Sequence, residues 1–392
     1  MTPLIALLRT QDGMPQVRAH MDQPWVMWSG ALKEWRRPPA DDELMQLSSS
    51  TECVVVGQEK PGGMEWSEYF ILGLGIPAIW RTEILIHFMR DVKQVEPSAK
   101  YRAYMYALQL RPQQIAIISE STCFGVAGLA AIEKVTAKVE LSHILPMVLS
   151  GGQKERAQYP SYPEVTIVIC TFNEEQRIGW ALQSVFAQTG NHFECIISDD
   201  GSTDRTIDRV RMIDDPRLRI TSLPSNRGKA HALNAALRIA RGKYLLELDA
   251  DDWLPPHAVT TLFEAMDCEA SDVGLLTSFY HLWRRNRYDD LIYRGIQESQ
   301  QITVSNHFAK VPIPRLYRTD VLREFEGWDV HDSSRGRLYE DVAMTARFLK
   351  QSKIAMVKQA LYHRVIRHSS ISQQHDHEYT VWARENLDGG DD

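Results

Sequence analysis

Three carboxylates follow the apolar residues 244–248 in the stretch YLLELDADDWLPP. Asp249 and Asp251 are separated by one residue, so both side chains would point to the same side if the chain stays extended. Two hard oxygen ligands at a strand end suit Mg²⁺ or Mn²⁺ that is shared with a diphosphate. Such an ion makes a nucleoside diphosphate a better leaving group, because it neutralises the developing negative charge. The alternative is a solvated acidic turn, since aspartate is common where strands end.

Two other segments carry polar groups that fit the same chemistry. In SDDGSTD, Asp200 could accept a hydrogen bond from a nucleobase N–H or from a ribose hydroxyl. In NRGKAHALN, Lys229 stands at the start of an expected helix, where a cation and free backbone N–H groups suit phosphate oxygens. Taken alone, Lys229 is interpreted equally well as a solvent-facing lysine.

The elements that must position these residues alternate between strand and helix patterns. Apolar runs predict strands at 165–170, 193–198, 218–222 and 244–248. Amphipathic patterns predict helices between them, at 178–186, 206–212 and 228–240. This alternation predicts parallel βαβ units, in which ligands bind outside the carboxyl ends of the strands. The polar clusters TFN, DDGSTD and DADD follow three of the strands, so we expect them to converge on one edge of the sheet.

The length of the chain, 392 residues, is sufficient for two domains. The stretch GGQKERAQYPSYP, at 151–163, is rich in Gly, Pro and polar residues and predicts a linker. It would join a small N-terminal α/β domain, residues 1–150, to a larger α/β domain at 164–380. The acidic residues 381–392 are expected to form a disordered tail. Patterns in the first domain predict two strands and two helices, at 53–56, 115–118, 82–92 and 101–110.

Composition excludes several classes of protein. A net charge of -7 argues against general nucleic-acid binding, which needs a basic surface. The five cysteines are widely spaced and form no C-x-x-C pair, which indicates reduced thiols and argues against a zinc site. No apolar run reaches the ~18 residues of a membrane span, and the N-terminal run is too short for a signal peptide. We therefore expect a cytoplasmic protein, and leave open its peripheral association with a membrane surface and its oligomeric state.

Five motifs occur in order along residues 163–375: VTIVICTFNEE, IISDDGSTDRT, NRGKAHALNAAL, GKYLLELDADDWLPP and YEDVAMTARF. Together they resemble the family-2 glycosyltransferases with the GT-A fold, a Rossmann-like, mostly parallel sheet with flanking helices. Residues 1–150 lie outside this resemblance. It implies an inverting, metal-dependent transfer of a sugar from a nucleotide-sugar donor, commonly a UDP-sugar, to an acceptor hydroxyl. The acceptor would be a saccharide or glycoconjugate, as in the synthesis of surface polysaccharide.

The resemblance also implies roles for residues on the donor side. Thr171 and Phe172 would border the base and ribose, and Glu174 would help to hold the nucleoside. Asp200 would bind the base, commonly uracil, and Lys229 would face the nucleotide.

The same resemblance implies a metal site for Mn²⁺ or Mg²⁺. Asp249 and Asp251 would form the D-x-D pair, with Asp251 the stronger candidate for a metal ligand. The segment HRVIRHSSIS resembles a basic segment that closes over the diphosphate in some relatives, and its His368 is a further metal candidate. A surface loop is the alternative for this segment.

On the acceptor side, the motif LYEDVAM would supply the catalytic base, Asp341, with Glu340 beside it. A carboxylate can accept the proton of the attacking hydroxyl if it lies within hydrogen-bond reach. Apolar spacing after this motif predicts a helix, so the alternative is an acidic helix start, which stabilises by ~0.3–1 kcal/mol. Trp328 resembles an aromatic residue near the donor or acceptor sugar, and core packing fits it equally well. Arg315 is interpreted as support for the fold.

Two rival functions make different predictions. A sugar-1-phosphate nucleotidyltransferase needs a glycine-rich signature with Arg and Lys after the first strand, which TFNEEQR does not match. A non-catalytic nucleotide- or sugar-binding scaffold would be favoured by the loss of an acidic motif, yet Asp200, Asp249, Asp251 and Asp341 are all present. The sequence identifies neither the sugar, the acceptor nor the linkage.

Overall fold

The computed structural model describes residues 162–190, 192–285, 291–299 and 311–366, with Val139, His143, Trp382 and the backbone of five short N-terminal strands. The chain divides into two compact units. The first comprises Met1–Leu149 and Asn286–Ile292, and the second comprises Ser150–Arg285 and Tyr293–Asp392. Each unit has its own sheet.

The first unit contains a five-stranded sheet of order β1-β2-β4-β3-β5. Its strands are Ile5–Arg9, Trp25–Ser29, Cys53–Gly57, Ala78–Arg81 and Ile115–Ser119, numbered β1 to β5. β4 pairs antiparallel with β2 and β3, whereas β1 with β2 and β3 with β5 are parallel. The strands predicted at 53–56 and 115–118 are thus confirmed. The helices predicted at 82–92 and 101–110 lie outside the described residues, as does nearly all of the predicted linker.

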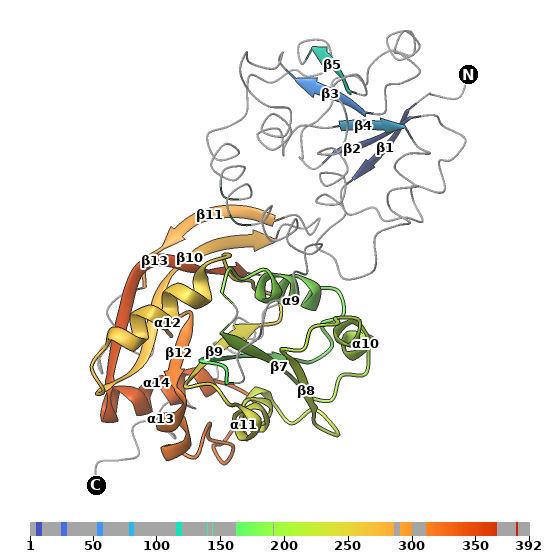
Figure 1. Cartoon of the computed structure of the whole chain (residues 1–392). Coiled ribbons are helices and arrows are strands. Elements are labelled where there is room, and N and C mark those ends of the chain that lie inside the picture. Colours follow the sequence, from blue (N-terminus) through green and yellow to red (C-terminus); the bar gives the residue numbers. More distant parts are fainter. Residues whose placement is uncertain are drawn as a thin grey trace. The chain divides into compact units, whose positions relative to one another are not determined.

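The second unit is built on an eight-stranded mixed sheet (Figure 1). Its parallel half has the order β9-β6-β7-β8. These strands are Tyr244–Asp249 (β9), Val165–Thr171 (β6), Phe193–Asp199 (β7) and Leu218–Ser222 (β8). All four were predicted from their apolar runs, and the predicted α/β class is confirmed.

The other half of the sheet begins with β12 (Arg315–Arg318), which pairs antiparallel with β9. β10 (Val273–Arg285) follows, antiparallel to β12, and pairs with both β11 (Leu291–Gln297) and β13 (Lys353–Ile366). β13 runs parallel to β10 along most of its length. The sequence did not predict this half.

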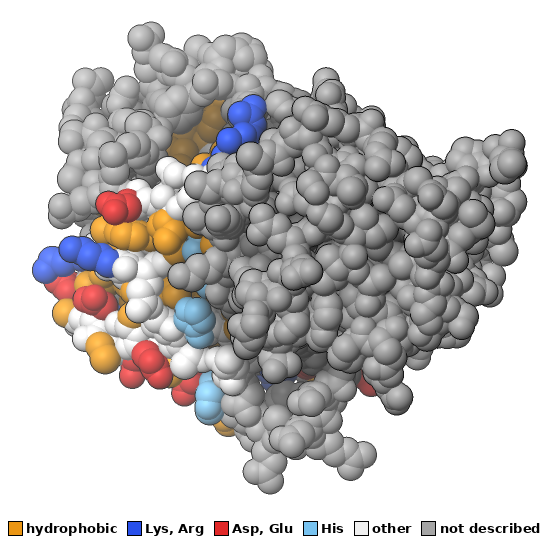
Figure 2. All heavy atoms as spheres, turned by 90° about the horizontal axis from the view of Figure 1, so that it is seen from above, with side chains coloured by type: hydrophobic (Ala, Val, Ile, Leu, Met, Phe, Trp, Pro, Cys, Tyr) orange, Lys and Arg blue, Asp and Glu red, His pale blue; other side chains and the backbone are white. Residues whose placement is uncertain are grey.

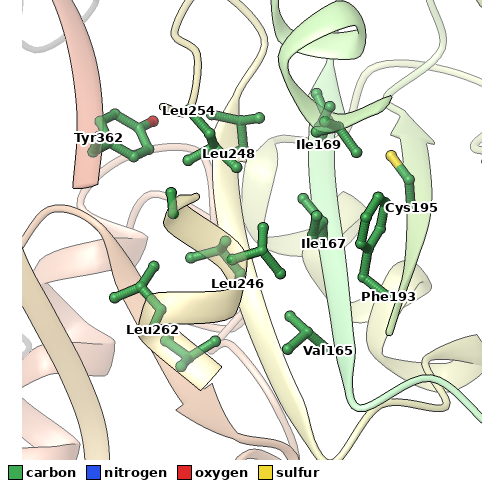
Figure 3. Close-up of a cluster of buried hydrophobic side chains, with 14 of the residues drawn as sticks. Val165, Ile167, Ile169, Phe193, Cys195, Leu246, Leu248, Leu254, Leu262 and Tyr362 are labelled. Atoms are coloured by element: carbon green, nitrogen blue, oxygen red, sulfur yellow. The ribbon is translucent and has the colours of Figure 1, made fainter. Parts of the chain in front are cut away.

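Helices cover both faces of the sheet, because successive strand side chains point to opposite faces. Val165, Ile167 and Ile169 pack with α9 (Ile178–Phe186) and α12 (Ala258–Cys268) on one face (Figure 3). Val168 belongs to the core on the other face. That core includes α11 (Lys229–Ile239) and α14 (Glu340–Gln351). Two short helices, α10 (Thr206–Arg211) and α13 (Thr319–Glu324), complete the described elements of this unit.

In the part of the chain that the structure describes, none of the helices combines the length and the apolar character needed to cross a bilayer. On the face seen in Figure 2, the described acidic, basic, histidine and apolar side chains are interspersed.

Candidate active site

The ends of three parallel strands meet at one edge of the second sheet, as the polar clusters predicted. Thr171 at the end of β6 is in register with Asp199 at the end of β7, and Cys170 is in register with Asp249 at the end of β9. The backbone N–H of Asp200 donates to the carbonyl oxygen of Thr171 over 2.9 Å. The polar clusters after these strands therefore lie side by side.

The loops after β6 and β7 are joined by hydrogen bonds. The backbone N–H of Asn173 donates to Ser202 Oγ over 3.0 Å, and its side-chain Oδ1 accepts from the backbone N–H of Thr203 over 2.8 Å. The backbone N–H of Glu174 donates to Thr206 Oγ1 over 2.8 Å. The asparagine in TFN thus fixes the relative position of the first two polar clusters.

The three residues expected beside the nucleoside have different surroundings. Phe172 is one of the exposed large apolar side chains, whereas Thr171 is buried. Thr171 Oγ1 has no hydrogen-bond partner among the described residues, which is unusual for a buried hydroxyl. The carboxylate of Glu174 pairs with Arg177 over 2.9 Å.

Asp200 holds the loop that precedes α11. Its two carboxylate oxygens accept from the backbone N–H groups of Arg227 and Gly228, each over 2.8 Å. Gly228 has a φ of 106°, and a Cβ there would lie 2.7 Å from the carbonyl oxygen of Gly336. Only glycine fits this approach without strain. The next residue is Lys229, so the close approach of Gly228 to Gly336 fixes the backbone position from which the lysine side chain extends.

Lys229 points into a group of carboxylates rather than to solvent. Its Nζ lies 2.6 Å from Asp249 Oδ1, 3.6 Å from Glu340 Oε1 and 3.8 Å from Glu247 Oε2. Burial opposes its charge, but these carboxylates raise the pKa of Lys229 well above its usual value. The reading of Lys229 as a solvent-facing lysine is therefore wrong.

Asp249 stays ionised in this setting. Burial alone would raise its pKa, but the charges of Lys229 and Arg315 lower the pKa of Asp249 to about 2. Its side chain is still 37% exposed.

The D-x-D segment is a turn, which corrects one expectation from the sequence. β9 ends at Asp249, and the backbone N–H of Asp252 donates to the carbonyl oxygen of Asp249 over 3.1 Å. The extended chain therefore does not continue to Asp251, and the alternation of a strand does not decide where Asp251 points. Carboxylate donors at an open strand end still fit Mg²⁺ or Mn²⁺, which prefer oxygen ligands. His368 lies outside the described residues.

The third aspartate, Asp252, connects this turn to β13. It is buried, and it accepts from Tyr362 Oη over 2.9 Å and from the backbone N–H of Val365 over 2.7 Å. Tyr362 Oη in turn accepts from the backbone N–H of Asp249 over 3.1 Å. Figure 3 shows Tyr362 reaching from β13 toward β9. Burial and the charges of Asp251 and Asp249 raise the pKa of Asp252 well above its usual value.

Glu340 and Asp341 begin α14, as predicted. Asp341 Oδ1 accepts from the backbone N–H of Val342 over 2.8 Å, and Oδ2 lies 3.9 Å from Arg315 Nη1. The side chain of Asp341 is 32% exposed, while that of Glu340 is only 11% exposed. Burial and the charge of Asp341 raise the pKa of Glu340 to about 7.

Glu247 is the member of the site that the sequence did not single out. It lies in β9 with a side chain only 4% exposed, opposite Arg315 on β12. Arg315 Nε and Nη2 donate to its two oxygens over 3.2 and 2.9 Å, and Tyr317 Oη donates over 2.8 Å. A signal existed, because a glutamate inside an apolar strand pattern needs a buried partner.

Trp328 lies in the hydrophobic core beside α11 and α14. Its ring packs edge-on against Tyr317 at 5.8 Å, and its backbone N–H and carbonyl bond with the side chain of Asn234. Of the two roles that the sequence left open for Trp328, the structure shows core packing.

The loop that leads into α14 is covered by Trp382. This side chain is buried, its Nε1 donates to Asp332 Oδ2 over 2.7 Å, and its ring lies 4.8 Å from that of Tyr339. Asp332 also accepts from the backbone N–H of Gly336 and from Ser334 Oγ, each over 2.6 Å. The expectation of a disordered tail is therefore wrong at Trp382; the other residues of 381–392 lie outside the described residues.

Part of the chain is similar to known glycosyltransferases. The family model "Glycosyl transferase family 2" matches residues 166–325. The succinoglycan biosynthesis protein ExoO of Rhizobium meliloti is 35% identical over 113 residues, which cover 29% of this chain and 32% of that protein. The glucosyltransferase WfaP of Escherichia coli, named for a UDP-Glc donor and a diphosphoundecaprenol-linked acceptor, is 35% identical over 105 residues, covering 27% and 42%.

Among solved structures, Staphylococcus aureus TarS 1-349 in complex with UDP aligns with a TM-score of 0.44 and 22% identity. This alignment covers 57% of this chain and 66% of that one. The matched segment spans only 32% of the length of ExoO and 42% of WfaP. Residues 166–325, which include the strands and loops that hold Asp200, Lys229 and Asp249, thus match glycosyltransferase family 2.

Proposed function

We propose that this chain is an inverting, metal-dependent glycosyltransferase that moves a sugar from a UDP-sugar to an acceptor hydroxyl in the synthesis of a polysaccharide or glycoconjugate. The observation that carries the proposal is the convergence of Lys229, Asp249, Glu340 and Asp341 at the carboxyl edge of the parallel strands. The UDP donor is supported by the relative WfaP, whose name specifies UDP-Glc.

In the proposed donor site, each residue has a role that fits its surroundings. Thr171 and Phe172 border the base and ribose, where the buried Thr171 hydroxyl offers a hydrogen bond to a ligand. Asp200 holds the loop that precedes Lys229 and has lone pairs left to accept a hydrogen bond from the base. Glu174 supports the nucleoside. Lys229 carries a stable positive charge. When the donor binds, this charge would contact the diphosphate in place of the carboxylates.

Asp249 and Asp251 would hold Mn²⁺ or Mg²⁺. When bound, such an ion supplies Lewis-acid stabilisation of the leaving diphosphate. Asp249 contributes a carboxylate that is ionised well below neutral pH, which suits a metal ligand.

Asp341 is the proposed catalytic base. As the acceptor oxygen bonds to the anomeric carbon, the hydroxyl proton passes to Asp341, and the bond from that carbon to the diphosphate breaks with its electron pair on the leaving group. Attack opposite to the leaving group inverts the anomeric centre. Asp341 fits this role better than Glu340, because its side chain is 32% exposed and that of Glu340 only 11%.

Release of UDP from a panel of UDP-sugars, with Mn²⁺, Mg²⁺ or EDTA, tests this proposal. We expect metal-dependent release by the wild type and at least ~100-fold less by Asp251→Ala and Asp341→Asn. Asp267→Asn is a matched control, because Asp267 on α12 is an exposed carboxylate that contacts Lys243 and Tyr244 at the start of β9, away from these residues.

Two results would contradict the proposal in different ways. The non-catalytic scaffold would be favoured if the protein bound UDP with metal but released no UDP from any UDP-sugar, even with acceptor saccharides present. Full activity in Asp341→Asn would remove Asp341 as the base. A cytoplasmic location and contact with a membrane surface stay predictions from the sequence.

A further inference from the structure

A buried ion pair lies between the sheet and the two helices that carry the site. Glu247 and Arg315 face each other on neighbouring antiparallel strands, with side chains only 4% and 5% exposed. Two parallel hydrogen bonds join them, from Arg315 Nε over 3.2 Å and from Nη2 over 2.9 Å. On one side Glu247 Oε2 lies 3.8 Å from Lys229 Nζ, and on the other Arg315 Nη1 lies 3.9 Å from Asp341 Oδ2. The pair therefore connects the proposed donor and acceptor sides.

The guanidinium of Arg315 has a fixed orientation. Glu247 engages two of its nitrogens, and the third, Nη1, donates to the carbonyl oxygen of Pro312 over 3.2 Å. Because the guanidinium is planar, these contacts decide which edge faces Asp341. Glu247 is fixed as well, since Tyr317 Oη donates to Oε1 over 2.8 Å.

Stability alone is a poor reason for this arrangement. Two charges taken out of water lose hydration that their attraction recovers only with good geometry, and apolar replacements of buried ion pairs are often no less stable. A guanidinium with a fixed orientation can, in contrast, orient a neighbouring carboxylate, and Arg315 Nη1 lies 3.9 Å from Asp341 Oδ2.

We propose that Arg315 is a positioning residue for sugar transfer: locked by Glu247, its guanidinium keeps the Asp341 carboxylate turned so that it can take the acceptor proton. This inference rests on the proposed function, because it assigns Arg315 a role toward the proposed base. Arg315 itself touches neither donor nor acceptor in this scheme.

The variant Arg315→Lys tests the inference, because it keeps a positive charge but cannot form the two-pronged contact with Glu247 and reach toward Asp341 at once. We expect kcat to fall by about 10- to 100-fold, as for a slightly misplaced catalytic group, with the KM for the UDP-sugar within about twofold. The matched control is Arg318→Lys on the same strand, since Arg318 donates to the backbone carbonyls of residues 269, 270 and 273. It should leave kcat unchanged.

A second variant covers a failure of the first to fold. Glu247→Leu with Arg315→Met replaces the pair by apolar side chains of similar volume, which cores tolerate. It should retain UDP binding, keep the KM for the UDP-sugar within about twofold and lower kcat by about 10- to 100-fold, because nothing would then hold the Asp341 carboxylate in position. A purely structural pair would change the melting temperature without lowering kcat.

The outcomes separate this inference from the function on which it rests. A wild-type enzyme that turns over, with kcat unchanged in both the Arg315→Lys and the double variant, would overturn the positioning role alone. A wild-type protein that neither binds UDP nor releases it from any donor would overturn the proposed function and this role together.

Discussion

At the scale of single residues, the site is a set of charges that compensate one another. Lys229 contacts both Asp249 and Glu340, yet the pKa of Asp249 is lowered to about 2 while that of Glu340 is raised to about 7. The difference has a physical cause. Asp249 has the ammonium group at 2.6 Å, whereas Glu340 has it at 3.6 Å and has the charged Asp341 as its neighbour. Near neutral pH, Asp249 is therefore ionised, whereas Glu340 is close to its own pKa and exchanges its proton.

The raised pKa of Glu340 predicts a pH-dependent stability. The fold raises this pKa from 4.5 to about 7, so between these pH values the native state holds a proton that the unfolded chain has lost. The stabilisation is complete below pH 4.5 and is lost as the pH rises through about 7. In EDTA and without nucleotide, the urea midpoint of the wild type should therefore fall more between pH 5 and pH 8 than that of Glu340→Gln. Parallel curves for the two proteins would contradict the prediction.

Sequence motifs identified most of these residues but not all of the contacts between them. Lys229, Asp249 and Asp341 were found because polar groups stood where strands end or a helix begins. Glu247 was missed because its neighbours in the strand are apolar and its partner, Arg315, is distant in the sequence. The direction of Asp251 was not predictable either, because the turn after Asp249 replaces the alternation of a strand.

At the scale of elements, β13 fastens the turn that holds the proposed metal ligands. Tyr362 bridges the backbone of Asp249 and the carboxylate of Asp252, and the backbone of Val365 holds the other oxygen of Asp252. The turn after β9 is therefore held in place by a strand that is not its neighbour in the sheet. The backbone conformation of this turn should therefore depend on Tyr362 as much as on the residues of the turn itself.

The variant Tyr362→Phe tests this dependence. It leaves the buried Asp252 short of a donor and the Asp249 N–H without its acceptor, so we expect a loss of about 1–3 kcal/mol in the free energy of unfolding. Affinity for Mn²⁺ in the presence of UDP should fall about 10- to 100-fold, as for other supports of metal ligands. Urea titration and Mn²⁺ titration calorimetry measure the two effects.

A matched control is Tyr244→Phe, since the hydroxyl of Tyr244 bonds to Asp267 away from the turn. It should change the affinity for Mn²⁺ by less than about twofold. Equal Mn²⁺ affinity in Tyr362→Phe and the wild type would show that β13 does not support the metal ligands.

The same scale explains which elements were predictable. β6 to β9 and the helices between them form consecutive βαβ units, so their apolar patterns and local connections sufficed. The pairing of β10 with β13 joins distant segments and contains register shifts, neither of which a local pattern reveals. β12 is only four residues long, too short for a period to be recognised.

At the scale of the whole molecule, the family match covers only part of the second unit, and the proposed acceptor side lies beyond the match. The match ends at residue 325, so it includes the strands and loops of the proposed donor site but not α14 and Asp341. The proposed donor site is therefore supported by the family match and by the geometry together. The position of the proposed base is supported by the geometry and by the sequence motif.

Ligand-linked stability tests the donor site in the complete chain. UDP with Mn²⁺ at about 100 times the dissociation constant should add about 2.7 kcal/mol to the free energy of unfolding, or about 5–10 °C in the melting temperature of the second unit. Asp251→Ala should lose the part that depends on Mn²⁺, while Asp267→Asn should keep it. A shift of the same size in Asp251→Ala, measured by thermal denaturation, would contradict a metal role for Asp251.

The burial of Trp382 against the loop before α14 has a consequence for synthesis on the ribosome. Translation proceeds at about 5–20 residues per second, so Trp382 is made several seconds after Asp341. During that interval Asp332 lacks the indole N–H that it accepts in the finished protein, and Tyr339 lacks its aromatic neighbour. The nascent chain can form its parallel strands early, but the loop leading to the proposed base reaches its final contacts only when this late residue emerges. A message truncated before codon 382 would then yield a protein whose donor side is folded and whose acceptor side is unfinished.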